Sequence, residues 1–423
     1  MLGLVALIIA SDKGRKLTPL LSKYTYEICG QAMISYAIDA GLEAGAQRLV
    51  VLSGQDSDLI RELIPKDSAF IQNDEKSADE NIIYKIQDAF KKNKSETILI
   101  LPGEYPLING STLKAAYEYH LGKNNQVTVL TNTEGSLSDI CFINTDLLLS
   151  EFSSPKDITT DFCIKNIIKR LYAGGQKVDS YCISNFSELL SVNDSSQLSE
   201  AERIILNRII KKHMDNGVIF HLPETSMIDN RVKIGKDTII HPGTILEGNT
   251  IIGENCNIGP YSRIQDSLVK DGVHFMNSVM IQSQIGNNTT VGPFAYIRPG
   301  SKIGENIKIG DFVEIKNSNI GNNSKVPHLS YIGDADVGKH VNVGCGAVVV
   351  NYNGKVKNRT LVGDHAFVGC NVNLVSPVVI NDYAYIAAGS TITDEVPEYA
   401  LAIARNRQTI IADWVKRKGL DRK

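Results

Sequence analysis

A six-residue period runs through the second half of the chain. Aliphatic residues recur at every sixth position from Ile228 to Ile264, where the register is lost, and again from Ile285 to Ile315. Residues 315–349 keep the spacing with two one-residue slips, and a last run extends from Val362 to Ile392. Neither an amphipathic helix nor an ordinary hairpin sheet repeats every six residues. A parallel β-helix does, because each hexapeptide forms one wall of a prism and points one aliphatic side chain inward. The period therefore predicts a parallel β-helix.

The one large insertion in this period is the segment "VNYNGKVKNRTL", residues 350–361. It is polar and cationic, and it is about one hexapeptide too long for a smooth coil. A solenoid accommodates such an insertion as a loop that leaves the prism, and binding sites are often built on loops. We therefore expect a loop and a candidate site at this break.

The first half of the chain alternates strand-like and helix-like segments. A helical pattern over residues 31–45 occurs among short runs rich in β-branched residues, which are "LVALIIA", "RLVVLSG", "ETILILPG" and "VTVLTN". Strands and helices in alternation indicate a parallel sheet with helices on its faces. We therefore expect an α/β domain ahead of the β-helix.

A polar, serine-rich stretch follows at residues 185–198 and is expected to be a linker. The next segment, residues 199–217, has the pattern of one helix. Ser199 and Glu202 have the spacing of a capping box, and Asn216–Gly217 is typical of a helix end. We expect this helix to join the two halves.

Composition excludes several classes of protein. The chain has 423 residues, 43% of them hydrophobic, and a formal net charge of −3, which favours neither nucleic acid nor an anionic membrane as a partner. The seven cysteines are scattered without CxxC spacing and suggest neither a disulfide framework nor a zinc site. The apolar run before Ser11 is too short for a membrane span. We therefore expect a cytoplasmic protein of two or three domains with no membrane span.

Two basic residues close to the loop have a spacing that indicates an anion site. Arg298 and Lys316 lie three hexapeptides apart, which is one full coil. We expect them one above the other on the same wall, about 5 Å apart by strand spacing. Two cations this close repel each other unless an anion lies between them, and a phosphate is the simplest such anion. The sequence therefore predicts a phosphate-binding site here.

A histidine and several polar residues surround this position in the sequence. His328 follows Pro327, where we expect the walls to be disturbed, and its imidazole can accept a proton near neutral pH. The sequence has no Ser-His-Asp order, no HExxH motif and no cluster of metal ligands. The simplest mechanism is therefore a direct acyl transfer assisted by one general base. Other candidates in this region are Tyr331, Asn342, Asn351, Tyr352 and Lys357.

Residues 228–416 closely resemble the acetyltransferase half of a bacterial bifunctional family, the N-acetylglucosamine-1-phosphate uridylyltransferase/glucosamine-1-phosphate N-acetyltransferases. The segments that carry the resemblance are "VGPFAYIRPG", "IGDFVEIKN", "HLSYIGDADVG", "NVGCGAVVVNYNG", "FVGCNVNLVSPV" and "IAAGSTITDEVPEYALAIAR". Hexapeptides alone indicate only a broad superfamily, whereas "HLSYIGDA" together with "NYNGKVK" is much more specific. The resemblance implies a left-handed β-helix, a homotrimer, acetyl-CoA as co-substrate and an active site between neighbouring subunits.

The resemblance also implies roles for individual residues. His328 matches the general base of the family. The residues that match contacts to the sugar phosphate are Arg298, Lys316, Tyr331, Asn342, Asn351 and Lys357. The residues at acetyl-CoA positions are Cys345, Tyr352, Cys370, Ala388 and Arg405. In this chain Cys345 and Cys370 replace an alanine and a serine of the family.

The first half resembles the uridylyltransferase half of the same family more faintly. "CGQAMISYAIDA" matches well, but the family loop L-A-A-G-x-G-T-x-M reads "IASDKGRKL" here, with Asp12 in place of a glycine. A carboxylate there adds bulk and a like charge beside nucleotide phosphates, where even screened repulsion costs on the order of 1 kcal/mol or more. This substitution argues against a working nucleotide site.

Other positions of the first half differ from the family pattern as well. Its Gly-Thr-Gly becomes Ser77, Ala78 and Asp79, and its Gly-Tyr-Gly-Arg and Glu-His-Lys segments have no match. The resemblance places Lys23 and Gln72 at nucleotide positions, and it places Glu104 and Asn193 at a magnesium site, where Glu104 replaces an aspartate. We therefore predict that uridylyl transfer is lost and that Mg²⁺ is needed only if this domain is active.

These observations predict four segments and one main function. The segments are a shortened nucleotidyltransferase-like (Rossmann-like) α/β domain over 1–190, a linker and helix over 191–217, the β-helix acetyltransferase domain over 218–396 and a C-terminal tail and helix over 397–423. We expect an acetyl-CoA-dependent N-acetyltransferase that acts on an amino sugar phosphate, most simply glucosamine 1-phosphate, in UDP-N-acetylglucosamine biosynthesis. The alternatives are a bifunctional enzyme that also transfers a uridylyl group, and a non-catalytic trimeric paralogue.

Overall fold

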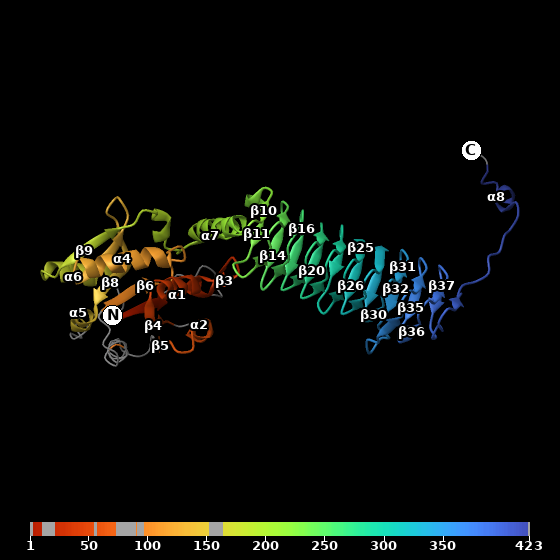
Figure 1. Ribbon diagram of the computed structural model, residues 1–423, viewed down its shortest axis with the longest axis horizontal. Helices are drawn as coiled ribbons and strands as arrows, with labels where there is room; N and C mark the ends of the chain where they lie inside the picture. Colours follow the sequence, from red (N-terminus) through yellow and green to blue (C-terminus); the bar gives the residue numbers. More distant parts are fainter. Residues whose placement is uncertain are drawn as a thin grey trace. The chain divides into compact units, whose positions relative to one another are not determined.

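The computed structural model describes residues 3–10, 22–54, 57–72, 90, 97–151 and 164–421 (Figure 1). The chain divides into two compact units, Met1–Arg208 and Ile209–Lys423. The division falls within helix α7, Ser195–Asp215. Among the described residues, no helix combines the length and apolar character needed to cross a membrane.

The first unit is built on a mixed seven-stranded sheet in the order β5-β4-β1-β6-β8-β7-β9. Its strands are β1 (Leu4–Ala10), β4 (Ala46–Ser53), β5 (Ala69–Gln72), β6 (Thr97–Pro102), β7 (Val127–Thr131), β8 (Leu137–Asn144) and β9 (Val178–Cys182). The predicted sheet was wholly parallel, and this is wrong for β8, which pairs antiparallel with β6 and β7. The chain reverses between β7 and β8 through a tight turn at Gly135, whose φ is +77°, so no crossover helix separates these two strands.

Helices cover both faces of this sheet because alternate residues of β1 point to opposite sides. Val5, Leu7 and Ile9 are buried in one cluster with residues of helix α6, whereas Ala6 and Ile8 lie beneath Gly41 of helix α1. The helices of this unit are α1 (Met33–Glu43), α2 (Ser57–Leu63), α4 (Gly110–Gly122), α5 (Thr145–Glu151), α6 (Ile164–Ala173) and α7. The short elements are η1 (Lys23–Thr25), η3 (Phe186–Leu189) and the hairpin of β2 (Glu27–Ile28) and β3 (Gln31–Ala32).

The expected linker and helix differ from the structure. Helix α7 begins at Ser195, not at Ser199, and the stretch before it contains η3. Asp194 caps the helix, since its carboxylate accepts a hydrogen bond of 2.8 Å from the N–H of Gln197. The predicted capping box at Ser199 is therefore wrong.

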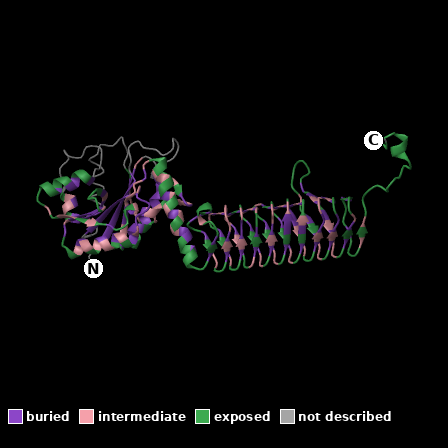
Figure 2. Cartoon of the chain, turned by 90° about the horizontal axis from the view of Figure 1, so that it is seen from above, coloured by how far each residue is buried: buried purple, intermediate pink, exposed green. Residues whose placement is uncertain are grey.

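The second unit is a parallel β-helix with three walls, as the six-residue period predicts (Figure 2). The first wall contains β10 (Ile219–Phe220), β13 (Ile239–Ile240), β16 (Asn257–Ile258), β19 (His274–Phe275), β22 (Thr290–Val291), β25 (Lys308–Asp311), β28 (Lys325–His328), β31 (Asn342–Val343), β34 (Phe367–Val368), β37 (Tyr385–Ile386) and β39 (Leu401–Ala402). The second contains β11 (Met227–Ile228), β14 (Ile245–Glu247), β17 (Arg263–Gln265), β20 (Val279–Ile281), β23 (Tyr296–Ile297), β26 (Glu314–Lys316), β29 (Tyr331–Gly333), β32 (Val348–Val350), β35 (Asn373–Val375) and β38 (Thr391–Ile392).

The third wall contains β12 (Lys233–Ile234), β15 (Ile251–Ile252), β18 (Leu268–Val269), β21 (Gln284–Ile285), β24 (Lys302–Ile303), β27 (Asn319–Ile320), β30 (Ala335–Val337), β33 (Thr360–Val362) and β36 (Val378–Ile380). The unit also has η4 (Pro223–Thr225) and a terminal helix α8 (Trp414–Arg417). The chain passes from the first wall to the second and then to the third. We call the turns between these walls the first–second edge and the second–third edge.

The apparent loss of the period between Ile264 and Ile285 does not interrupt the β-helix. Val269, Phe275 and Met280 continue the inward column and are fully buried. Three of the four steps from Ile264 to Ile285 are five residues long, and two of the side chains are aromatic or unbranched. A search for aliphatic residues at every sixth position therefore misses this coil.

The predicted loop at residues 350–361 leaves the prism between β32 and β33, as expected, and most of its residues are exposed (Figure 2). It folds back on itself: Tyr352 and Lys357 form an antiparallel bridge, and the N–H of Asn358 donates to the carbonyl of Asn351 over 2.7 Å. The loop therefore starts and ends at the second–third edge.

Candidate functional site

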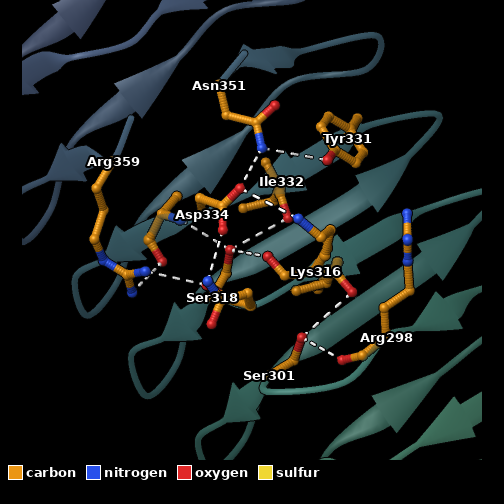
Figure 3. Close-up of polar contacts among 12 residues, drawn as sticks. Arg298, Ser301, Lys316, Ser318, Tyr331, Ile332, Asp334, Asn351 and Arg359 are labelled. Carbon is orange, nitrogen blue, oxygen red and sulfur yellow. Dashed lines mark hydrogen bonds and ion pairs between the residues drawn. The ribbon is translucent and has the colours of Figure 1, made fainter. Parts of the chain in front are cut away.

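The two basic residues at the second–third edge stack as their spacing predicts. Strands β23 and β26 are paired, and the N–H of Arg298 donates to the carbonyl of Ile315 over 2.8 Å. Arg298 and Lys316 therefore lie on neighbouring coils (Figure 3). Buried Ser301 and Ser318 fix the backbone, because their hydroxyls donate to the carbonyls of Arg298 and Lys316 over 2.7 and 2.8 Å.

Each of these cations has a carboxylate partner. The Nη1 atom of Arg298 lies 2.6 Å from Oε1 of Glu314, and the Nζ atom of Lys316 lies 3.4 Å from Oδ2 of Asp334. Without a ligand, the protein therefore balances the two cations with its own carboxylates. A phosphate at this edge would compete with Glu314 and Asp334 for them.

Asp334 is the centre of this network. Its carboxylate accepts hydrogen bonds from the side-chain amides of Asn317, at 2.6 Å, and of Asn351 (Figure 3). Burial by itself raises the pKa of Asp334, but these hydrogen bonds and the charge of Lys316 together hold that pKa below its usual value. Asp334 is therefore ionised and positions Lys316 and Asn351.

The loop adds a third cation to this edge. The ammonium group of Lys357 lies beside that of Lys316, which lowers the pKa of Lys357, and the charge of Arg298 lowers it further. Mutual repulsion of cations is the physical cause, and an anion bound among them would relieve it. We call Arg298, Lys316 and Lys357 the cationic group.

Arg359 anchors the end of the loop. Its guanidinium binds both carboxylate oxygens of Asp336 and donates to the carbonyls of Asn317 and Ala335 over 3.1 and 3.2 Å. A bidentate pair of this kind fixes both position and orientation. Arg359 therefore holds the part of the loop that carries Lys357 against the coil that contains Asp336.

Tyr331 lies flat against the second wall beside this network. A Cβ added to Gly333 would lie only 2.4 Å from Oη of Tyr331, so the ring lies over the bare backbone of Gly333. The side-chain amide of Asn351 lies 3.5 Å from that hydroxyl (Figure 3). The glycine therefore lets the tyrosine hydroxyl reach the second–third edge.

His328 lies at the other edge of the second wall. Strands β25 and β28 pair through to the residue pair Asp311 and His328, and Nδ1 of His328 lies 2.5 Å from Oδ1 of Asp311. This hydrogen bond lowers the pKa of Asp311. The carboxylate fixes the imidazole and leaves Nε2 for a substrate, which is the arrangement that a general base needs. Both side chains are exposed enough to meet a ligand.

Pro327 does not disturb the wall, contrary to the prediction. Strand β28 runs through it, and a Cβ on Gly310 below would lie 1.8 Å from the carbonyl oxygen of Pro327. Gly310 therefore allows the two backbones to approach closely and the pairing to extend to His328.

Four of the expected acetyl-CoA residues gather at the first–second edge, and His328 lies at the same edge. The register places His328 opposite Cys345, Cys345 opposite Cys370, and Cys370 opposite Ala388. Arg405 reaches this edge too. A Cβ atom added to Gly389, which follows Ala388 in the chain, would lie 3.6 Å from Cδ of Arg405. We call His328, Cys345, Cys370 and Ala388 the first–second column.

Other expected residues lie apart from this column within one chain. Asn342 is on the first wall, and Tyr352 is in the loop, where its hydroxyl donates to the carbonyl of Gly354 over 2.8 Å. The width of the second wall, residues 329–333, separates His328 from the cationic group. One copy of the chain therefore does not bring the expected base and phosphate contacts together.

In the first unit, three predicted residues converge on one point. The Nζ atom of Lys23 forms an ion pair with Oε2 of Glu104 and donates to Oδ1 of Asn193 over 2.9 Å. Ser191 completes the cluster, since its hydroxyl donates to Oε1 of Glu104 over 2.8 Å. The side chain of Lys23 is only 1% exposed. The protein's own ammonium group therefore occupies the position where two side-chain oxygens meet.

The cap of helix α7 positions Asn193. Gln197 accepts a hydrogen bond of 2.8 Å from the N–H of Asn193, while Asp194 caps the same turn. The N–H of Val192 donates to the carbonyl of Glu104 over 2.8 Å, which joins this segment to the end of strand β6. The predicted linker is thus a structured part of the site.

The oxygens of Glu104 and Asn193 fit a divalent cation. Both already converge on one positive charge, and Mg²⁺ is commonly held by one or two carboxylate or carbonyl oxygens together with substrate phosphates. No group of three or more His, Cys, Asp or Glu side chains suited to a metal occurs within the described ranges. A metal bound here would therefore need further oxygens from its substrate, and it would displace the ammonium of Lys23.

The remaining predicted nucleotide residues are Gln72, Asp12, Ser77, Ala78 and Asp79. Gln72 ends strand β5 and is exposed. Asp12, Ser77, Ala78 and Asp79 lie outside the described residues.

Two family descriptions match the chain, one for each unit. "Bacterial transferase hexapeptide (six repeats)" matches residues 231–266, 282–317 and 359–394, and "MobA-like NTP transferase domain" matches residues 6–170. The "Bifunctional protein GlmU" of Acetivibrio thermocellus is 41% identical over 454 aligned positions, which cover 99% of this chain and 98% of the relative. The chain belongs to the GlmU family. The GlmU of Clostridium kluyveri is also 41% identical, over 98% of this chain and 99% of its own length.

Membership of the GlmU family extends over both units. Nothing in the comparison indicates that the first unit has degenerated. The aligned stretch is longer than the 423 residues of this chain, so the Acetivibrio GlmU carries segments that this chain lacks. Among solved structures, a nucleotidyl transferase from Methanothermobacter thermautotroptrophicus is 17% identical and covers 49% of this chain and 99% of its own, with a TM-score of 0.41, which adds nothing to the GlmU assignment.

Sequence reasoning missed several residues of the two sites in this GlmU-family chain. They are Asp311, Glu314, Asp334, Asp336, Arg359 and Ser191. One sequence feature could have identified some of them. Asp311 and Asp334 lie 17 and 18 residues from His328 and Lys316, which is about one coil, and charged partners in a β-helix stack at that spacing.

Proposed function

We propose that this chain is a bifunctional enzyme of UDP-N-acetylglucosamine synthesis. Its second unit would transfer the acetyl group of acetyl-CoA to glucosamine 1-phosphate, and its first unit would transfer a uridylyl group from UTP to the product. The observation that carries the acetyltransferase half is the cationic group. Three basic side chains on two coils and one loop meet at one edge. The other two cations lower the pKa of Lys357, and an anion bound among them would raise that pKa again.

The residues of the second unit then act in a defined order. The cationic group holds the sugar phosphate, which fixes the position of the 2-amine. His328, oriented by Asp311, accepts a proton from this amine as its nitrogen attacks the thioester carbonyl. The C–S bond breaks, the acetyl group stays on nitrogen, and the sulfur of coenzyme A takes up a proton as it leaves. Acetyl-CoA would lie along the first–second column, toward Arg405.

A homotrimer is the assembly that this geometry supports best. The base and the cationic group lie at opposite edges of the second wall of one chain. A neighbouring copy could place its first–second edge against this chain's second–third edge and complete the site. We therefore propose that each active site takes residues from two subunits.

The first unit would use its Lys23 cluster for uridylyl transfer. The oxygens of Glu104 and Asn193 would hold Mg²⁺, which would neutralise phosphate charge when it is bound. Lys23 would then be free to contact the phosphates of UTP. The sugar phosphate would attack the α-phosphorus of UTP, and pyrophosphate would leave.

A second candidate is an acetyltransferase without uridylyl transfer. Asp12 in the loop and Asp79 in the uridine segment favour it, because carboxylates repel nucleotide phosphates. The full-length match to bifunctional relatives favours the first proposal. A non-catalytic paralogue is the weakest alternative, since the residues expected for acetyl transfer are all present.

Two assays on the full-length protein decide between these functions. One follows coenzyme A release over a panel of amino sugar phosphates, and the other follows pyrophosphate release from UTP with Mg²⁺ and N-acetylglucosamine 1-phosphate. Activity in both supports the bifunctional enzyme. Coenzyme A release alone supports the second candidate, and no activity in either assay supports the paralogue.

A further inference from the structure

Two cysteines lie next to each other at the first–second edge. Pairs on both sides of this edge, Asn342 with Phe367 and Val348 with Asn373, give the same register and set Cys345 directly opposite Cys370. The N–H of Asn371 donates to the carbonyl of Cys345 over 2.8 Å, which fits this pairing. Paired strands run about 4.8 Å apart, and Cα atoms of disulfide-bonded cysteines are usually 4.4–6.8 Å apart. The backbone separation therefore suits a disulfide bond.

The backbone around both cysteines packs closely. A Cβ on Gly344 would lie 2.5 Å from the backbone nitrogen of Cys370, and a Cβ on Gly369 would lie 2.6 Å from that of Ala388. Glycine directly before each cysteine therefore allows the two turns to approach. Both thiols are free in the structure, with Cys370 exposed and Cys345 half-buried.

No other pair of described cysteines has this relation. Cys29, Cys141 and Cys256 are buried, and Cys182 lies on strand β9 of the first unit. An oxidant in solution therefore reaches the pair at the first–second edge more readily than the core thiols.

We propose that Cys345 and Cys370 form a reversible disulfide that closes the acetyl-CoA site of this chain. The disulfide itself follows from the register, whereas its effect on acetyl-CoA rests on the proposed function. Ala388 continues the same column beyond Cys370, and His328 precedes Cys345. A disulfide in the middle of this column would draw the two turns together and fill the surface that the coenzyme needs.

The chemistry needs a small-molecule disulfide as the oxidant. The Cys345 thiolate attacks one sulfur of this disulfide, forms a mixed disulfide and releases the first thiolate. The Cys370 thiolate then attacks Sγ of Cys345 and releases the second. Two thiol protons leave the protein and end on the two released thiols, so the protein is oxidised by two electrons and the reagent is reduced by two. An excess of dithiol reverses both steps.

The test uses the full-length protein treated with oxidised glutathione. Peptide mass spectrometry should find Cys345 linked to Cys370 within one chain, with a mass about 2 Da lower than that of the reduced peptides. Acetyl-CoA binding, measured by calorimetry, should be lost on oxidation and should return with dithiothreitol. In Cys345→Ala and in Cys370→Ser, acetyl-CoA binding should be the same before and after oxidation, whatever its strength in the reduced variant. Cys182→Ser is the matched control and should behave like the wild type.

The outcomes separate this proposal from the proposed function. A persistent glutathione adduct, or a link between two chains, overturns the disulfide. An intrachain disulfide that leaves acetyl-CoA binding intact overturns the closure of the site. If the reduced protein does not bind acetyl-CoA at all, the coenzyme role fails together with the proposed function, while the mass spectrum still decides whether the disulfide forms.

Discussion

The two candidate sites balance their charges in opposite ways. In the first unit, an ammonium that is only 1% exposed lies between the oxygens of Glu104 and Asn193. In the second unit, the side chain of Arg298 is 37% exposed and its partner Glu314 is 40% exposed. A buried cation must have a partner because its desolvation is costly, whereas an exposed cation keeps much of its water. The first site therefore couples ligand binding to the internal balance of charge, whereas at the second site Arg298 is exposed enough to meet a ligand while it is paired with Glu314.

Local structure explains this difference. Lys23 is buried against Glu104, which follows the end of strand β6, so its side chain has little access to water. The cationic group lies on the outside of a β-helix, whose interior is filled by aliphatic side chains and whose turns face solvent. A charge change should therefore affect folding in the first unit and binding in the second.

The largest effect that we expect is loss of acetyl transfer in His328→Ala. Removal of a general base commonly lowers kcat by about 10²- to 10⁴-fold. Folding should be unchanged, because the side chain is half-exposed and its partner Asp311 is exposed too. Steady-state kinetics and a thermal melt check both parts. A variant with nearly full activity would exclude His328 as the base.

Arg298→Met should weaken binding of the sugar phosphate. A hydrogen bond to a charged group contributes roughly 1.5–3 kcal/mol, so KM should rise about ten- to a hundredfold while kcat changes little. The free energy of unfolding should change by only about 0–1 kcal/mol, as for other exposed ion pairs. An equal fall in kcat would instead place Arg298 in the chemical step.

Lys23→Met should reverse this pattern. It leaves the largely buried carboxylate of Glu104 without its cation, which should lower the free energy of unfolding by roughly 1–3 kcal/mol. Chemical denaturation of this variant and of Arg298→Met gives the direct comparison. Equal destabilisation by the two changes would refute the difference between the two sites.

The same variant should bind a divalent cation more readily without nucleotide. The ammonium of Lys23 competes for the oxygens of Glu104 and Asn193, and its removal frees them. Titration with Mn²⁺, followed by electron paramagnetic resonance, should show tighter binding in Lys23→Met than in the wild type. The double variant Lys23→Met/Glu104→Gln is the control and should lose this gain.

The smallest effect concerns Asp334 at acid pH. The pKa of its carboxyl is depressed in the folded protein, so its contribution to stability is complete above the unfolded value of about 3.9 and is lost as pH falls through the lower folded value. The melting temperatures of the wild type and Asp334→Asn should therefore differ at pH 7, and this difference should shrink as the pH falls below about 3.9. A constant difference across this range would show that the charge of Asp334 does not matter.

Much of the second unit could be predicted from the sequence because one short period describes it. Inward positions, the excluded loop and the stacking of Arg298 on Lys316 all follow from counting by six. The loss of register predicted between Ile264 and Ile285 was wrong, because steps of five residues and side chains such as Met280 continue the column there. The Asp311–His328 pair was not predicted. A slip at Ile320 shortens that coil by one residue, so the two residues lie 17 positions apart instead of the regular 18.

The first unit was harder to predict because its strand order is not periodic. The antiparallel strand β8 and the early start of helix α7 both depend on turns and caps that a pattern of apolar residues does not reveal. Lys23, Glu104 and Asn193 came from a resemblance, and nothing in their spacing indicated that they would meet.

The sequence by itself determined the β-helix, the two-unit organisation and the positions of most candidate residues, because hydrophobic periodicity dictates which side chains must be buried. Only the tertiary structure decided which charges are neighbours. It joined Lys23 to Glu104 and Asn193, gave each stacked cation a carboxylate, and brought Cys345 opposite Cys370 across a coil lengthened by the loop. These contacts join residues far apart in the chain, and they depend on register and on turn length, which the hydrophobic period does not specify.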